Sequence, residues 1–173
     1  RVSFLSPEMS IDEIETRLDT LLAQVLCGFT LRNSFLNSGH PINVLEYEEY
    51  LTNIKNRDDF HIYTPSKGYP FTIATVEEIL DNDAPDLMCI DGLPLLSTDD
   101  GKKAATEWQS FMAASYALKD LSETRHIPII TSSQANREAA KDLTTHPELD
   151  QIGFGDSLAQ ASDVVIPMAL PTK

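Results

Sequence analysis

The chain has 173 residues, of which 42% are hydrophobic, and this suits one globular domain over residues 1–173 with a sizeable core. Its 13 basic residues face 27 acidic ones, and the net charge of −14 argues against a nucleic-acid partner, since DNA-binding surfaces are usually basic. The apolar runs are far shorter than the ~20 residues that span a bilayer, so we expect no membrane partner.

Two cysteines, Cys27 and Cys89, are too few for a disulfide framework and have no metal-binding partner nearby in sequence. Both lie among apolar residues, so we expect small buried side chains in a reducing cytoplasm. The first apolar run, Val2 to Leu5, already has the pattern of a buried strand. Because such a strand belongs inside a domain, we expect the chain to be part of a longer protein.

Apolar runs alternate along the chain with segments of helical period, which is typical of βαβ units and a parallel sheet. After the first strand, Ser10 to Glu13 has the hydroxyl and the glutamate of a capping box, and it begins a helix expected over about 9–26. Gly28 is the expected end of this helix. An acidic helix is expected at about 44–56, and a short strand at 60–63.

The second half of the chain is expected to hold two more helices and three more strands. The first helix begins at a capping box, Thr75 to Glu78, and ends at Asp81, whereas the second runs from Ala104 to Arg125. The buried side of the longer helix is expected to consist of Trp108, Phe111, Met112, Leu118 and Leu121. The three strands are apolar runs at 87–90, 127–130 and 164–166. We therefore predict an α/β fold, a mostly parallel sheet flanked by helices on both faces.

Polar side chains follow three of the expected strands. Glu8 comes shortly after the first strand, Asp91 directly after 87–90, and Gln134 after 127–130. Because parallel sheets bind ligands at the carboxyl ends of their strands, we expect these three residues at one edge. An aspartate there can hold Mg²⁺, a glutamate can take a proton from water, and an amide can contact a terminal phosphate. The set therefore fits nucleotide hydrolysis.

Each of these residues also has a structural explanation when it is taken alone. Asp91 fits a turn former or a helix cap, Glu8 fits the acidic start of a helix, and Gln134 fits a solvated loop. Their joint occurrence after three separate apolar runs favours the nucleotide site.

Four segments carry more specific motifs, which are FLSPEMS (4–10), PDLMCIDGLPLL (85–96), IPIITSSQANR (127–137) and GDSLAQASDVV (155–165). In this order they resemble FSLEMS, PDLIVIDYLQLM, VPVIALSQLNR and GSIEQDADVV of the DnaB-family replicative DNA helicases, whose C-terminal domain is a RecA-like ATPase. The last segment is more similar to phage-encoded members. The chain departs from the family pattern at Pro7, Gly92 and Pro94, where Leu, Tyr and Gln are usual.

By position, this resemblance implies that Glu8 is the catalytic base, Asp91 the magnesium carboxylate and Gln134 the sensor of the γ-phosphate. It also implies a nucleotide contact at Ser133, with ATP and Mg²⁺ as cofactors. The implied function is ATP-dependent unwinding of duplex DNA by a homo-hexameric ring with single-stranded DNA at its centre. Primase and a helicase loader are the implied partners, in a bacterial cytoplasm and with a phage gene as the implied source.

The DNA-facing loops of the family would fall at about 97–106 and 141–156. Lys102, Lys103, Lys141 and Gly155 are the candidate DNA contacts in them. Ordinary surface loops explain these polar segments equally well. An acidic exterior is compatible with DNA in a ring, because only a few contacts of each subunit face the central strand.

The phosphate-binding motif Gly-x-x-x-x-Gly-Lys-Ser/Thr does not occur in the sequence, and Gly101-Lys102-Lys103 lacks both the earlier glycine and the hydroxyl residue. In the family this loop precedes the Glu8 strand, so we expect a P-loop NTPase fold without its P-loop segment, inactive when isolated. Two alternatives remain open, which are another RecA-like ATPase, of recombinase or clock type, and a non-catalytic RecA-fold binding module.

Overall fold

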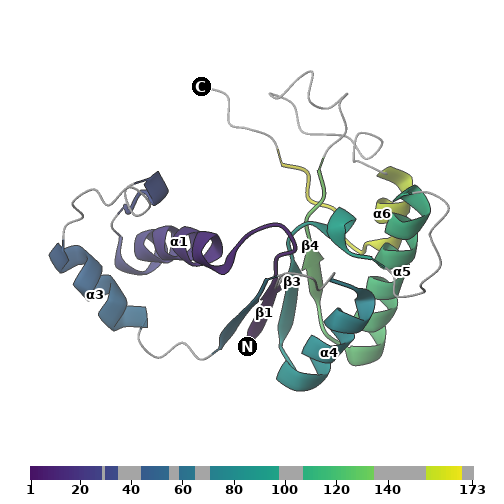
Figure 1. Cartoon of the computed structure of the whole chain (residues 1–173), viewed down its shortest axis with the longest axis horizontal. Helices are drawn as coiled ribbons and strands as arrows, with labels where there is room; N and C mark the ends of the chain where they lie inside the picture. Colours follow the sequence, from purple (N-terminus) through teal and green to yellow (C-terminus); the bar gives the residue numbers. More distant parts are fainter. Residues whose placement is uncertain are drawn as a thin grey trace, which may run out of the picture.

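The computed structural model describes residues 1–28, 30–34, 44–54, 59–64, 71–97, 107–134 and 155–168. At its centre is a parallel four-stranded sheet in the order β2-β1-β3-β4 (Figure 1). The strands are β1 (Val2–Leu5), β2 (Phe60–Tyr63), β3 (Leu87–Ile90) and β4 (Ile129–Thr131). Leu5 lies opposite both Tyr63 and Ile90, and Ile90 lies opposite Thr131. The predicted α/β fold with a parallel sheet is confirmed.

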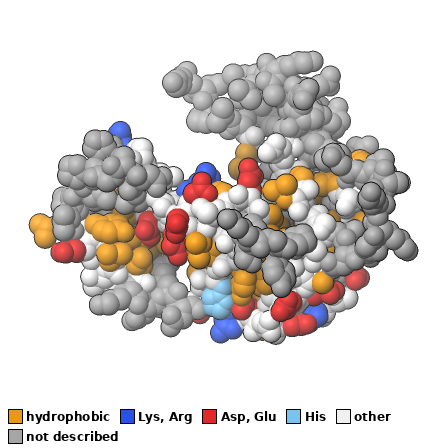
Figure 2. Space-filling model, in the orientation of Figure 1, with side chains coloured by type: hydrophobic (Ala, Val, Ile, Leu, Met, Phe, Trp, Pro, Cys, Tyr) orange, Lys and Arg blue, Asp and Glu red, His pale blue; other side chains and the backbone are white. Residues whose placement is uncertain are grey.

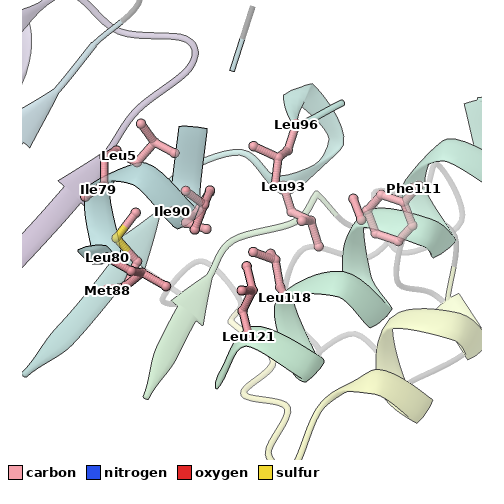
Figure 3. Close-up of a cluster of buried hydrophobic side chains, with 12 residues drawn as sticks. Leu5, Ile79, Leu80, Met88, Ile90, Leu93, Leu96, Phe111, Leu118 and Leu121 are labelled. Atoms are coloured by element: carbon pink, nitrogen blue, oxygen red, sulfur yellow. The ribbon is translucent and has the colours of Figure 1, made fainter. Parts of the chain in front are cut away.

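Helices α4 (Ile73–Asp83) and α5 (Glu107–Arg125) pack against one face of this sheet, to the right of the strands in Figure 1. Alternate strand residues point toward them, and Leu5, Met88 and Ile90 are at most 1% exposed. The rest of this cluster comprises Val76, Ile79, Leu80, Leu93, Leu96, Phe111, Ala114, Leu118 and Leu121 (Figure 3). Because burying one large aliphatic side chain stabilises a fold by about 1.5–3 kcal/mol, this cluster is the main core.

The opposite face of the sheet is less completely covered in the part of the chain that the structure describes. Phe4 of β1 is half-buried and stacks on Phe60 of β2, with ring centroids 6.1 Å apart, whereas Ile130 of β4 is 60% exposed. Cys89 lies on this face of β3, and burial raises the pKa of its thiol. Both Cys89 and Cys27 are free thiols of intermediate burial, so the prediction that both are buried is wrong.

The segment after β1 forms the predicted capped helix, α1 (Ile11–Leu22). The Ser10 hydroxyl accepts the N–H of Glu13 at 3.4 Å, and the Glu13 carboxylate accepts the N–H of Ser10 at 3.0 Å. The helix continues into a π-helical turn, η1 (Ala23–Cys27), and ends at Gly28, whose φ of 75° is left-handed. The local signals for both ends of this helix are confirmed.

Helix α3 (Val44–Ile54) packs against η1 rather than against the sheet. Together they form a second, smaller hydrophobic cluster around Ala23, Leu31 and Tyr50. Tyr50 is 0% exposed, and its hydroxyl donates to the Asp19 carboxylate at 2.5 Å. Figure 1 shows α1 and α3 lying away from α4 and α5, so the chain builds its apolar contacts in two places.

The capping box predicted at Thr75 with Glu78 is wrong, because α4 begins earlier. Thr72 is the N-cap, and its hydroxyl accepts the N–H of Thr75 at 3.2 Å while the Thr75 hydroxyl accepts the N–H of Thr72 at 3.3 Å. Two threonine hydroxyls therefore satisfy the backbone donors that a serine–glutamate pair satisfies in α1. The helix ends at Asp83, followed by Ala84 with φ of 43°, and so extends beyond the predicted end at residue 81.

The strand predicted at 164–166 is also wrong, since Val164 and Ile166 are 75% and 77% exposed and lie in no strand. An apolar run becomes a strand only when a neighbouring strand can pair with it. Trp108 was predicted on the buried side of α5 but is 48% exposed, because it lies in the first turn. The other predicted core positions that are buried on this helix are Phe111, Leu118 and Leu121. Residues 104–106 of the predicted helix lie outside the described residues.

The strand predicted at 127–130 is shifted toward the C-terminus, to Ile129–Thr131. The N–H of Ile127 donates instead to the Ser122 carbonyl of α5 at 3.2 Å. Pro128 has no N–H to donate, but its carbonyl accepts the N–H of Met88 at 3.1 Å. The pairing of Ile90 with Thr131 matters for the site, because it sets which residue after β4 lies beside Asp91.

Candidate nucleotide site at the strand ends

The carboxyl ends of β1, β3 and β4 lie at the same edge of the sheet, since the strands are parallel and Leu5, Ile90 and Thr131 lie at one level. Asp91 follows β3 directly and is half-buried. Glu8 and Gln134 follow β1 and β4 by three residues each, and both are exposed. The structure therefore brings the three predicted strand ends together, and ligands of parallel sheets bind at this edge.

Asp91 is fixed by both neighbouring strands. Its N–H donates to the Leu5 carbonyl of β1 at 2.8 Å, and its Oδ1 accepts the Ser132 hydroxyl at 2.8 Å. The N–H of Gly92 donates to the same hydroxyl oxygen at 2.9 Å. Gly92 has a φ of 101°, a conformation that disfavours the side chain usual here in similar helicase segments. A departure in sequence thus coincides with a turn that only glycine adopts readily.

The turn that carries Glu8 is fixed through a buried serine. Ser6 is 0% exposed, its N–H donates to the Tyr63 carbonyl at 2.9 Å, and its hydroxyl accepts the N–H of Met9 at 3.3 Å. These bonds fold the chain from β1 into α1 and leave Glu8 on the surface. Among the described residues, no hydrogen bond or ion pair involves the side chain of Glu8 or of Gln134.

The donor set at this edge fits a hydrated magnesium ion better than a metal held by protein alone. No group of three or more His, Cys, Asp or Glu side chains occurs within the described segments. Mg²⁺ usually takes only one or two carboxylates and completes its shell with water and phosphate oxygens. One carboxylate such as that of Asp91 could therefore hold the ion, with water and the phosphate oxygens of a nucleotide completing its shell.

The two neighbouring serines after β4 have different environments. Ser132, which the sequence motif did not single out, contacts Asp91. Ser133, which was the predicted nucleotide contact, has a buried hydroxyl with no hydrogen-bond partner in the described part of the chain. The register that pairs Ile90 with Thr131 was the missing information, because it places residue 132 beside residue 91.

The predicted DNA contacts are only partly covered by the structure. Lys102, Lys103 and Lys141 lie outside the described residues, and Gly155 is the first residue of α6 (Gly155–Ala161), which packs beside α5. Figure 2 shows acidic side chains at several places on one face of the molecule and only isolated Lys and Arg side chains. None of the described helices combines the length and hydrophobicity needed to cross a membrane.

A second polar cluster, buried between β1, β2 and α4, was not predicted. The Oδ2 atom of Asp83 accepts hydrogen bonds from the Ser3 hydroxyl at 2.7 Å, the Tyr63 hydroxyl at 2.7 Å and the His61 ring at 2.8 Å. Although burial alone would raise the pKa of Asp83, these hydrogen bonds hold it below its usual range. Burial and the bond to Asp83 raise the pKa of Tyr63 to about 12. This cluster ties β2, the outermost of the described strands on its side of the sheet, to the core.

Comparison with known proteins relates this chain to replicative DNA helicases. The family model described as "DnaB-like helicase C terminal domain" matches residues 1–170. A probable plasmid replicative DNA helicase of Chlamydia psittaci is 26% identical over 166 residues, and a probable replicative DNA helicase of Trieres chinensis is 25% identical over 167. Each match covers 95% of this chain but 35% of the relative, so the chain spans about a third of their length.

The fold itself is found in a solved structure of a DnaB-like replicative helicase, described with its interactions with primase. That match has a TM-score of 0.74 and 17% sequence identity, and it covers 94% of this chain and 38% of the other. At this level of identity the likeness concerns the fold alone.

Proposed function

This chain belongs to the DnaB-like helicase C-terminal domain family, and on that premise we propose that the full-length protein hydrolyses ATP to unwind duplex DNA in replication. The observation that supports this best is the parallel register of β1, β3 and β4, whose carboxyl ends are followed by Glu8, Asp91 and Gln134. The family match favours a helicase over a recombinase or a clock-type ATPase. Two carboxylates and an amide at one sheet edge favour an active ATPase over a non-catalytic module.

In this proposal each residue acts at a different atom of the nucleotide complex. Asp91 holds the hydrated cation, and Glu8 accepts a proton from the attacking water. Gln134 hydrogen-bonds the terminal phosphate, and Ser133 is a further nucleotide contact. Mg²⁺, when bound, neutralises charge on the phosphate oxygens. Asp91 is half-buried, so it is still accessible to a hydrated cation, and Glu8 is exposed, so water can reach its carboxylate.

The assembly and partners follow from the family and are part of the same proposal. We expect a homo-hexameric ring in the cytoplasm, with single-stranded DNA at its centre and with primase and a helicase loader as partners. Lys102, Lys103, Lys141 and Gly155 are the proposed DNA contacts. If Lys102 and Lys103 neutralise phosphates, reversing both charges should flatten the salt dependence of single-strand binding, because fewer counterions are released.

Glu8→Gln in the full-length protein tests the catalytic assignment. The amide keeps the size and hydrogen bonding of the side chain but cannot accept the proton, so turnover should fall by roughly 10²–10⁴-fold. Nucleotide binding should stay within about twofold, because ground-state contacts survive. Glu15→Gln, at another exposed glutamate on α1, is the matched control and should leave both quantities unchanged. Turnover at the wild-type rate in Glu8→Gln would show that the base lies elsewhere.

A further inference from the structure

Ser132 bridges the ends of β3 and β4 at the proposed cation ligand. Its N–H donates to the Ile90 carbonyl at 3.1 Å, and its own carbonyl accepts the N–H of Leu93 at 3.1 Å. These two backbone bonds hold the residue on both sides, and its hydroxyl contacts Asp91 at 2.8 Å. The position of the hydroxyl is therefore set by the sheet rather than by a free loop.

The direction of each hydrogen bond at this hydroxyl follows from chemistry. A backbone N–H can only donate, so the Gly92 N–H donates a hydrogen bond to the Ser132 hydroxyl oxygen at 2.9 Å. An ionised carboxylate can only accept, so the hydroxyl proton points to Oδ1 of Asp91 at 2.8 Å. This arrangement occupies Oδ1 and fixes the carboxylate, while Oδ2 accepts no hydrogen bond from the rest of the described chain.

We propose that Ser132 is a positioning residue, which orients the Asp91 carboxylate so that its free oxygen faces the divalent cation of a bound nucleotide. This inference rests on the proposed function, because it needs Asp91 to be the cation ligand. Hydrogen bonds from neighbouring groups to a metal-binding side chain commonly tune metal affinity by about 10–100-fold.

The neighbouring serine cannot share this role. Successive residues of an extended strand point to opposite sides, and β4 leads directly into Ser132 and Ser133. The Ser133 hydroxyl is buried and has no partner within the described residues, whereas Ser132 is exposed at the strand end. Of the two serines, only Ser132 therefore contacts the Asp91 carboxylate.

The test compares Ser132→Thr with Ser132→Val in the full-length protein, since these side chains have nearly the same shape and differ in the hydroxyl. Equilibrium binding of a fluorescent, non-hydrolysable ATP analogue is measured over a Mg²⁺ series, so the readout does not depend on turnover. Ser132→Val should raise the Mg²⁺ concentration for half-maximal binding on the order of tenfold, and Ser132→Thr should stay near wild type. Thr124→Val, which removes an exposed hydroxyl on α5 that donates to the Asp120 carbonyl, is the control and should cause no shift.

Asp91→Asn, measured in the same series, separates failure of the inference from failure of the proposed function. If Asp91→Asn raises the Mg²⁺ requirement but Ser132→Val and Ser132→Thr behave alike, the positioning role is overturned and the cation site stands. An equal shift in Thr124→Val would also overturn it. If Asp91→Asn itself has no effect, Asp91 is not the cation ligand and the proposed site is wrong.

Discussion

Asp83 and Asp91 are both held by hydrogen bonds next to the same sheet, but the two sites differ in what they leave free. Asp83 is 8% exposed, and one of its oxygens accepts three side-chain donors. Asp91 is half-buried at the carboxyl edge, and among the described residues one side chain donates to it. A carboxylate surrounded by protein donors acts as a structural anchor, whereas one that keeps an unpaired oxygen at a strand end can bind a ligand.

The largest difference between the two carboxylates should appear in ATP hydrolysis by the full-length protein. Asp91→Asn removes the charge beside the cation and should lower turnover by about 100-fold or more, as expected for loss of electrostatic stabilisation. Asp83→Asn should leave turnover per folded molecule within about twofold. Steady-state ATPase assays, normalised to the folded fraction by circular dichroism, measure both. Similar losses in the two variants would erase the distinction.

For the free energy of unfolding, the larger loss should occur in Asp83→Asn and the smaller one in Asp91→Asn. Asp83→Asn keeps the size of the side chain but replaces one acceptor of a buried network, and it should cost roughly 1–3 kcal/mol of unfolding free energy. Asp91→Asn should cost less, because this side chain is half-exposed and water can replace the lost bond. Urea unfolding of the full-length protein gives both values. Greater destabilisation by Asp91→Asn would mean that the strand-end carboxylate is structural.

The smallest effect should be a pH dependence of stability that belongs to the Asp83 cluster. The pKa of Asp83 is lowered by folding, so its contribution is present above the ordinary aspartate value of about 4 and is lost as pH falls through the folded value. The pKa of Tyr63 is raised to about 12, so its contribution is present below about 10 and is lost as pH rises toward 12. Urea midpoints of wild type and Tyr63→Phe across pH measure this.

The alkaline loss should become smaller in Tyr63→Phe, because phenylalanine has no proton to lose, while Tyr47 and Tyr50, whose pKa values are also raised, still contribute. The acid loss should remain, since Asp83 keeps its bonds from Ser3 and His61. An unchanged alkaline loss in Tyr63→Phe would assign it to another group.

Much of the fold could be predicted because its signals are local. The helix cap at Ser10, the stop at Gly28 and the buried strands β1 and β3 each depend on residues a few positions apart. Two of the failed predictions depend on partners distant in sequence. Val164 to Ile166 is apolar enough for a strand but lies outside the described sheet, and Trp108 has helical spacing but precedes the part of α5 that meets the core.

In the candidate site, too, local features could be predicted from the sequence, and contacts between distant residues could not. That Glu8, Asp91 and Gln134 follow apolar runs is visible in the sequence, and the parallel sheet makes those runs end at one edge. The Ser132 contact and the Asp83 cluster could not be predicted, because each depends on the register between strands. One residue of shift in β4 decides whether residue 132 or its neighbour lies beside Asp91.

The central claim is that the carboxylate after β3 holds the cation of a nucleotide at this sheet edge. The most direct measurement is an anomalous-difference map from crystals of the full-length protein with Mn²⁺ in place of Mg²⁺ and a non-hydrolysable ATP analogue. The account predicts one Mn²⁺ peak between the analogue's phosphates and Asp91, bound to the carboxylate directly or through a single water, with Ser132 still donating to Oδ1. A nucleotide-bound Mn²⁺ peak away from Asp91, with no water linking the two, would contradict the account.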